Sequence, residues 1–185
     1  MDPLRTRLDR TEAALLVVDI QERMCAAMDP EKLARMTNRA RALIVGAGAL
    51  GLPVVVTEQY SKGLGPTLEP LRAALPEAAR SVEKNQFSCS LPEVLEALCG
   101  RRQVLLCGME THVCVFQTAR DFLEKGIVPY LCADALLSRT EEDKRWGLER
   151  CRDLGAVVTT AEGALFDLLG CAGTPEFKAV SAAVK

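Results

Sequence analysis

QVLLCGMETHVCVFQTARDFLEK, residues 103–125, contains a change of pattern that indicates how the chain folds. The run 103–109 is almost entirely apolar, which is typical of a strand buried on both faces of a sheet. From residue 112 onward the apolar positions recur at helical spacing, and Gly108 permits a sharp turn between the two patterns. The stretch therefore predicts a buried strand, a tight turn and a helix, in that order.

The same alternation extends along the chain in both directions. Short β-branched runs predict further strands at 13–19, 53–58, 79–84, 127–133 and 156–160. Segments of helical period predict helices at 31–50, 91–98, 112–125, 140–154 and 161–169. Strands that are apolar on both faces need helices on both sides, and parallel strands need right-handed crossovers. We expect a single domain, 1–185, with a three-layer α/β/α, Rossmann-like doubly wound fold around a mostly parallel six-stranded sheet.

Two segments need separate interpretation. GAGALG (46–51) matches the G-x-G-x-x-G pattern of dinucleotide-binding folds, but a helical stretch precedes it and a strand follows, the reverse of what such a site needs. We interpret its glycines as a helix end and a turn, and expect no NAD(P) binding. The C-terminal segment TPEFKAVSAAVK (174–185) has no clear place in the pattern, and we expect it either to pack on a neighbouring subunit or to fray.

The composition is that of an ordinary globular domain and narrows the range of partners. The chain has 25 acidic and 23 basic residues, and the basic residues are scattered along it, so we expect no nucleic-acid partner. The N-terminus lacks an apolar leader region and the apolar runs are too short to cross a bilayer, so we expect a cytoplasmic protein without a membrane partner. With eight cysteines, none spaced C-x-x-C, and one histidine, we expect free thiols, no metal and no cofactor.

Three reactive side chains follow predicted strands. Asp19 closes the first strand, Lys84 closes the third, and Cys114 comes shortly after the fourth. Each has an ordinary interpretation, as a turn aspartate, a solvated lysine and a small buried cysteine. However, the carboxyl ends of parallel strands open on one edge of the sheet, and ligands of doubly wound folds bind there. The three side chains could therefore converge on one site.

Cys114 is the candidate nucleophile of this group. If Thr111 is the helix N-cap, Cys114 lies in the first turn, where the helix dipole and a nearby Lys84 ammonium favour the thiolate. Free N–H groups of the same turn could hold an oxyanion. We expect Glu110 to point away or meet a cation, and His112 to face solvent or a subunit contact. The other cysteines are interpreted as core residues or as lacking a catalytic context: Cys25, Cys89, Cys99, Cys107, Cys132, Cys151 and Cys171.

Four motifs together resemble the isochorismatase-like cysteine hydrolase superfamily, which includes nicotinamidases, N-carbamoylsarcosine amidohydrolases and ureidoacrylate hydrolases. They are LLVVDIQ at the first strand, PVVVTEQY at the second, VEKNQFS at the third, and GMETHVCVFQTARDFLEKG across the fourth strand and its helix. The resemblance covers nearly the whole chain. The stretch TEQYSKGLGPT is most similar to a subgroup of small isochorismatase-domain proteins.

The resemblance implies a catalytic triad of Asp19, Lys84 and Cys114. It also implies a cis peptide between Met109 and Glu110, an oxyanion hole made by the backbone N–H groups of Glu110 and Cys114, and a homo-oligomer. The candidate pocket residues are Gln21, Gln59, Tyr60 and Phe87.

Two departures from the family pattern narrow the expected function. Metal-binding nicotinamidases carry an aspartate and histidines after the second strand, where this chain has Glu58, Gln59 and Tyr60, so nicotinamidase activity is not the first expectation. Isochorismatases proper lack the nucleophilic cysteine and cleave a vinyl ether. The resemblance therefore favours cysteine-dependent hydrolysis of a C–N bond in a small amide, carbamoyl or ureido substrate. The alternative is a non-catalytic member that binds a partner or senses oxidation through Cys114.

Overall fold

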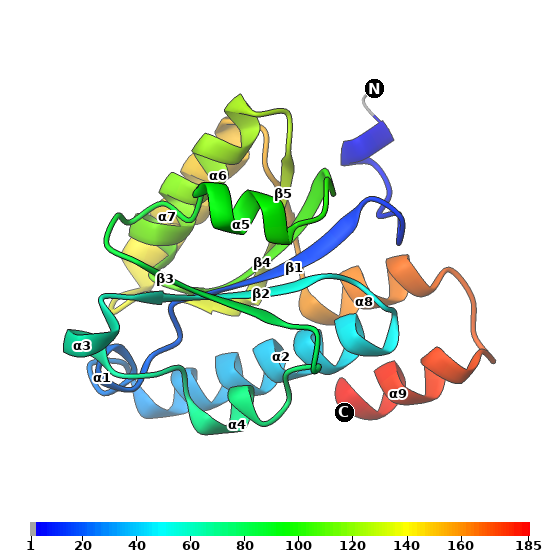
Figure 1. The fold of residues 1–185 in the computed structure, drawn as a ribbon, viewed down its shortest axis with the longest axis horizontal. Helices are drawn as coiled ribbons and strands as arrows, with labels where there is room; N and C mark the ends of the chain where they lie inside the picture. Colours follow the sequence, from blue (N-terminus) through cyan, green and yellow to red (C-terminus); the bar gives the residue numbers. More distant parts are fainter. Residues whose placement is uncertain (1–2) are drawn as a thin grey trace.

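Six parallel strands form one sheet in the order β3-β2-β1-β4-β5-β6, with helices on both faces (Figure 1). The strands are β1 (Ala13–Val18), β2 (Val54–Gln59), β3 (Arg80–Lys84), β4 (Gln103–Met109), β5 (Val128–Leu137) and β6 (Val157–Thr159). This computed structural model describes residues 3–185. The predicted three-layer, doubly wound α/β fold is confirmed. The main difference is in β5, which continues past the predicted end at residue 133 to Leu137.

Each face of the sheet has its own apolar core and its own helices (Figure 1). Along β1, Leu15 and Val17 point to one face and Leu16 and Val18 to the other, as the alternation of a strand requires. The first face is covered by α2 (Pro30–Ala49), α8 (Ala161–Leu169) and α9 (Pro175–Ala183), with α4 (Glu69–Arg72) beside α2. The second face is covered by α5 (Pro92–Ala97), α6 (Phe116–Glu124) and α7 (Glu141–Asp153).

The remaining helices are short and lie in the connections. They are η1 (Pro3–Arg5), α1 (Glu22–Cys25), α3 (Ser61–Leu64) and the π-helical turn η2 (Thr111–Val115). Within residues 3–185, none of the helices combines the length and the apolar character that crossing a bilayer requires.

The glycines of GAGALG end α2, as interpreted from the sequence. Gly46 and Gly48 lie in its last turns, and Gly51 follows with a φ of 69°. A Cβ at Gly46 would collide with Leu165 of α8, so this glycine permits the close approach of the two helices. The role of Gly46 is therefore in the packing of α2 against α8.

The C-terminal segment neither frays nor needs a neighbouring subunit, so the prediction for 174–185 is wrong. It forms α9, whose Val180 is fully buried and which lies against α2 (Figure 1). Thr174 caps this helix by accepting a hydrogen bond from the Phe177 N–H at 3.2 Å, and Arg39 of α2 donates to the Val184 carbonyl at 2.8 Å. The sequence contained the signal, since a threonine followed by a proline is a common helix start.

Candidate active site

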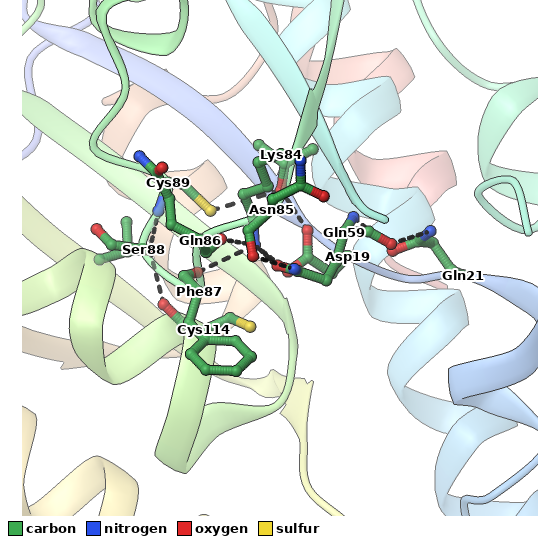
Figure 2. Close-up of polar contacts among 12 residues, drawn as sticks. Asp19, Gln21, Gln59, Lys84, Asn85, Gln86, Phe87, Ser88, Cys89 and Cys114 are labelled. Carbon is green, nitrogen blue, oxygen red and sulfur yellow. Dashed lines mark hydrogen bonds and ion pairs between the residues drawn. The ribbon is translucent and has the colours of Figure 1, made fainter. Parts of the chain in front are cut away.

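The three predicted catalytic residues converge beyond the carboxyl ends of β1, β3 and β4 (Figure 2). Asp19 directly follows β1, Lys84 is the last residue of β3, and Cys114 lies in η2 after β4. All three are buried, with exposed fractions of 0%, 3% and 4%. Because β2 lies between β1 and β3, its last residues also reach this site.

The Asp19 carboxylate is held from two sides. The Lys84 ammonium donates to Oδ2 at 2.6 Å, and the Thr57 hydroxyl of β2 donates to Oδ1 at 2.7 Å. The backbone of Asp19 has a φ of 49°, a left-handed conformation that aspartate tolerates better than most residues. Its charge is therefore buried with a partner for each oxygen, as a buried charge requires.

The Lys84 ammonium is surrounded by acceptors. Besides Asp19 it donates to Gln59 Oε1 at 2.8 Å and to the Phe87 carbonyl at 3.0 Å, with the Gln86 carbonyl at 3.2 Å. Burial by itself would lower the pKa of Lys84, but its neighbours Cys89, Asp19 and Cys114 raise it above the ordinary value of 10.5. Lys84 is thus a fixed positive charge and not a base.

The surroundings of Cys114 favour the thiol and run against the thiolate expected from the sequence. Burial raises the pKa of Cys114 to about 12, and the Asp19 carboxylate and its hydrogen bond to the thiol act in the same direction, whereas Lys84 lowers it. The thiol also sits in a π-helical turn followed by α6, and not in the first turn of an ordinary α-helix. The proton therefore needs a base, and Asp19 is in contact with it.

The turn that carries Cys114 has an unusual backbone. The peptide bond between Met109 and Glu110 is cis, and Gly108 has a φ of 123° with its Cα so close to β1 that a Cβ would collide with the Val18 carbonyl. Glu110, and not the predicted Thr111, is the N-cap. Thr111 instead ties the turn to β5, since its hydroxyl donates to the Leu137 carbonyl at 3.1 Å.

The backbone N–H groups of this turn differ in their partners. The Val113 and Val115 N–H groups donate to the Glu110 carbonyl at 3.1 and 3.3 Å. The Glu110 N–H has no backbone acceptor outside the helices and strands of the described residues, and the Cys114 N–H lies within the π-helical turn. These are the two groups that the resemblance assigns to the oxyanion hole.

The side chains of Glu110 and His112 bind elsewhere. Glu110 accepts hydrogen bonds from the backbone N–H and Nε of Arg139, both at 3.1 Å, which confirms that it meets a cation. His112 Nδ1 forms a hydrogen bond with Ser138 Oγ at 3.1 Å. His112 is half-buried with one ring nitrogen on its own chain, and its partial exposure leaves the expected solvent or subunit contact a prediction.

The four predicted pocket residues divide into two pairs. Gln21 is fully buried: its oxygen accepts from the Gln59 N–H at 2.8 Å and its NH₂ donates to the Gly65 carbonyl at 2.7 Å. Gln59 holds Lys84 and donates to the Asn85 carbonyl. Both side chains therefore hold the backbone and Lys84 around the site, and a substrate contact of the buried Gln21 stays a prediction.

Tyr60 and Phe87 form the second pair of pocket candidates. The Tyr60 and Phe87 residues are 55% and 52% exposed. Tyr60 follows Gln59, whose side chain accepts a hydrogen bond from Lys84, and the Phe87 carbonyl accepts one directly. Tyr60 has a φ of 38°, and its ring lies so close over Gly63 that a Cβ there would collide with it. Both aromatic side chains remain available to a substrate.

Two residues of the site were missed in the sequence. One is Thr57, whose contact with Asp19 is given above. The other is Cys89, interpreted as a core residue, whose Sγ lies 3.5 Å from Thr57 Oγ1 and whose N–H donates to Thr118 Oγ1 at 2.8 Å (Figure 2). Burial and the nearby Asp19 raise the pKa of Cys89 to about 11, although Lys84 lowers it. The only sequence signal was proximity, because Cys89 follows the predicted third strand closely.

Comparison with known proteins assigns the family. The sequence matches the isochorismatase domain family over residues 13–163. It is 38% identical to isochorismatase domain-containing protein 2 of Xenopus laevis over 94% of this chain and 84% of that protein. Among solved structures, a protein named MAR1 ribonuclease from Caenorhabditis elegans has a TM-score of 0.92 and 35% identity, covering 97% of this chain and 92% of that one.

A further solved structure, YcaC from Escherichia coli, is described as an octameric hydrolase of unknown specificity. It has a TM-score of 0.82 and 26% identity over 92% of this chain and 85% of that one. The family match covers most of the chain, and the buried Asp19, Lys84 and Cys114 lie within it. The chain belongs to the isochorismatase family of hydrolases.

Proposed function

We propose that this chain hydrolyses the C–N bond of a small amide, carbamoyl or ureido compound through an acyl-enzyme on Cys114. The observation that carries the proposal is the buried carboxylate of Asp19. It is fixed by Thr57 and Lys84, and it lies near enough to the Cys114 thiol to raise the pKa of that thiol. A weakly acidic thiol beside an oriented carboxylate is an arrangement for general-base activation of a nucleophile.

In the first half-reaction the Asp19 carboxylate takes the thiol proton while Sγ attacks the carbonyl carbon. Because burial raises the pKa of Cys114, proton transfer and attack occur together and not through a stable thiolate. The carbonyl electron pair moves onto the oxygen, where the N–H groups of Glu110 and Cys114 are proposed to stabilise it. When the tetrahedral intermediate collapses, the C–N bond breaks and Asp19 gives its proton to the leaving nitrogen.

The second half-reaction releases the acyl group. Asp19 takes a proton from water, the hydroxyl attacks the thioester carbonyl, and the C–S bond breaks with return of the proton to Sγ. Lys84 stays protonated throughout, since its pKa is raised. Its positive charge offsets the negative charge on Asp19 and on the reacting sulfur. The burial of all three groups excludes bulk water and favours a small substrate.

Further parts of the proposal concern the pocket and the assembly. Tyr60 and Phe87 are the proposed contacts of the substrate beyond its carbonyl group, because both are exposed beside the buried site. A homo-oligomer is proposed because the related YcaC of Escherichia coli is an octamer.

The alternative role in redox sensing is less well supported, since burial disfavours the reactive thiolate that a sensor needs.

The test is a screen of simple amides, carbamoyl amino acids and ureido acids for release of ammonia or amine. We expect repeated turnover on at least one compound class, loss of at least about 10⁴-fold in kcat in Cys114→Ala, and little change in Cys151→Ala. Cys151 is a matched control because it is also a buried cysteine, in α7. Turnover that persists in Cys114→Ala would contradict the mechanism.

The name of the Caenorhabditis elegans relative gives a second candidate reaction, cleavage of RNA. An RNA oligonucleotide is therefore included in the same screen. A thiol, a carboxylate and a buried ammonium suit acyl transfer better than phosphodiester cleavage, so we expect no cleavage that depends on Cys114.

A further inference from the structure

A second charged region lies apart from the candidate active site. It is a cavity of about 660 Å³ between α2, the end of β5, the start of α7 and the segment after α9. None of the catalytic candidates lines it. Cavities of this size commonly hold small organic ligands.

The lining of this cavity, here called the cationic cavity, is dominated by positive charge. Its basic residues are Lys32, Arg35, Arg39, Arg41, Lys144 and Lys185. Its acidic residues are Asp134 and Glu141. The chain as a whole has a net charge of −2, so this concentration of positive charge runs against the overall balance.

Ion pairs neutralise only part of that charge. Lys32 pairs with Glu141 at 2.9 Å, and Arg39 lies 3.7 Å from Asp134. Within residues 3–185, Arg35, Arg41, Lys144 and Lys185 form no ion pair. The six basic side chains of the lining therefore outnumber its two carboxylates, Asp134 and Glu141.

Lys144 is a partly buried lysine of this lining. Burial is the main cause that lowers its pKa, while Glu141 and Asp134 raise it by more than Lys32 and Arg35 lower it. A negatively charged ligand would supply the missing interaction and favour the protonated amine.

The cavity also offers an apolar surface. Ala183 and Val184 of its lining are partly buried, and Ala182 is exposed. Arginine binds phosphate oxygens through two parallel N–H donors, which suits a dianion better than a single carboxylate. We propose that the cationic cavity binds a small organic phosphate, with the phosphate beside Arg35 and Lys144 and the carbon body against Ala183 and Val184. This proposal does not depend on the proposed hydrolase reaction.

The test is isothermal titration of the full chain with phenyl phosphate, inorganic phosphate and phenol at pH 7.5 and fixed ionic strength. Phenyl phosphate combines both features, and the other two probes carry one each. We expect saturable binding of one phenyl phosphate per chain, at least about fivefold tighter than inorganic phosphate, and no measurable binding of phenol. No saturable binding of phenyl phosphate, or equal affinity for inorganic phosphate, would overturn the proposal.

A matched pair of variants locates the site. Arg35→Gln/Lys144→Gln removes two charges from the cavity, and Lys125→Gln/Arg152→Gln removes two exposed charges that do not line it. We expect at least about a tenfold loss of phenyl phosphate affinity in the first variant and less than about twofold in the second. Equal losses in both would show a nonspecific charge effect and overturn the proposal.

Two further outcomes would assign the cavity to a macromolecule instead. A short single-stranded RNA that binds more tightly than phenyl phosphate, and loses binding in the Arg35→Gln/Lys144→Gln variant, would identify a nucleic-acid surface. A change in oligomeric mass in that variant, measured by light scattering, would identify a contact between copies of this chain. Circular dichroism of each variant verifies that the fold is intact.

Discussion

The candidate active site and the cationic cavity lie at the carboxyl ends of different strands, and they treat charge in opposite ways. In the site, Asp19 and Lys84 are buried and each has protein partners already in place. In the cavity, Arg35 and Lys144 have no ion pair among the described residues. The comparison teaches that the charged side chains of the active site are held in place by the protein, as catalysis requires. Those of the cavity would gain their ion-pair partners from an anionic ligand.

The largest expected effect on stability comes from breaking the buried pair. Lys84→Met leaves Asp19 buried without its cation and should lower the free energy of unfolding by about 3 kcal/mol or more, measured by urea denaturation at pH 7. The double variant Asp19→Asn/Lys84→Met should be less destabilised than Lys84→Met, because it leaves no unpaired charge. A double variant that loses the sum of both single losses would contradict this view of the pair.

The pH dependence of the Lys84 contribution follows from the direction of its shift. The pKa of Lys84 is raised in the folded chain, so its stabilising effect is fully present below 10.5 and is lost as pH rises through the folded value. The difference in unfolding free energy between wild type and Lys84→Met should therefore be constant from pH 7 to 9 and shrink above about 10.5. A difference that already shrinks near pH 8 would mean that Lys84 is not held as an ammonium.

A smaller effect is expected from the second partner of Asp19. Thr57→Val keeps the shape of the side chain but removes the hydroxyl that donates to Oδ1, and kcat should fall about 10-fold to 100-fold with little change in KM. Thr57→Ser restores the donor and should recover most of the loss. If valine and serine behave alike, the hydroxyl does not position the base.

The reactivity of Cys114 provides a further comparison. Because burial raises the pKa of its thiol to about 12, alkylation by iodoacetamide should keep rising about tenfold per pH unit from pH 7 to 9 without levelling. The exposed Cys99 and Cys171 should react first, as read by peptide mass spectrometry. A rate for Cys114 that levels below pH 8 would show a thiolate and restore the expectation drawn from the sequence.

The smallest effect is expected where the site meets solvent. Arg139→Ala removes an ion pair with Glu110 in which the arginine side chain is 61% exposed. Unfolding free energy should change by less than about 1 kcal/mol, because exposed pairs contribute little. A larger loss in thermal or urea unfolding would mean that this pair holds the turn that carries Cys114.

The sequence predicted the parts of the site that depend on strand ends. Asp19 and Cys114 follow buried apolar strands and Lys84 ends a third, more polar strand, and the parallel arrangement places such ends on one edge. The contacts of Thr57 and Cys89 could not be predicted, because they depend on which strands are neighbours and on how a loop returns. The burial of Cys114 could not be predicted for a related reason, and it raises the pKa of a thiol that a helix start was expected to make more acidic.

The cationic cavity shows what composition cannot reveal. Its basic residues come from α2, α7 and the C-terminal segment, which are distant in the chain. They were interpreted as scattered because charge was judged along the sequence, and only the packing of α9 and α7 beside α2 brings them together. The absence of a local stripe therefore does not exclude a charged surface.

The central claim is that Cys114 carries the acyl group in a hydrolase reaction. The most direct measurement is an acid quench during turnover of the best amide or ureido substrate, followed by peptide mass spectrometry. The account predicts an added acyl mass on the peptide containing Cys114 in the wild type, and neither adduct nor turnover in Cys114→Ala. Turnover without any adduct on that peptide, together with retained activity in Cys114→Ala, would contradict it.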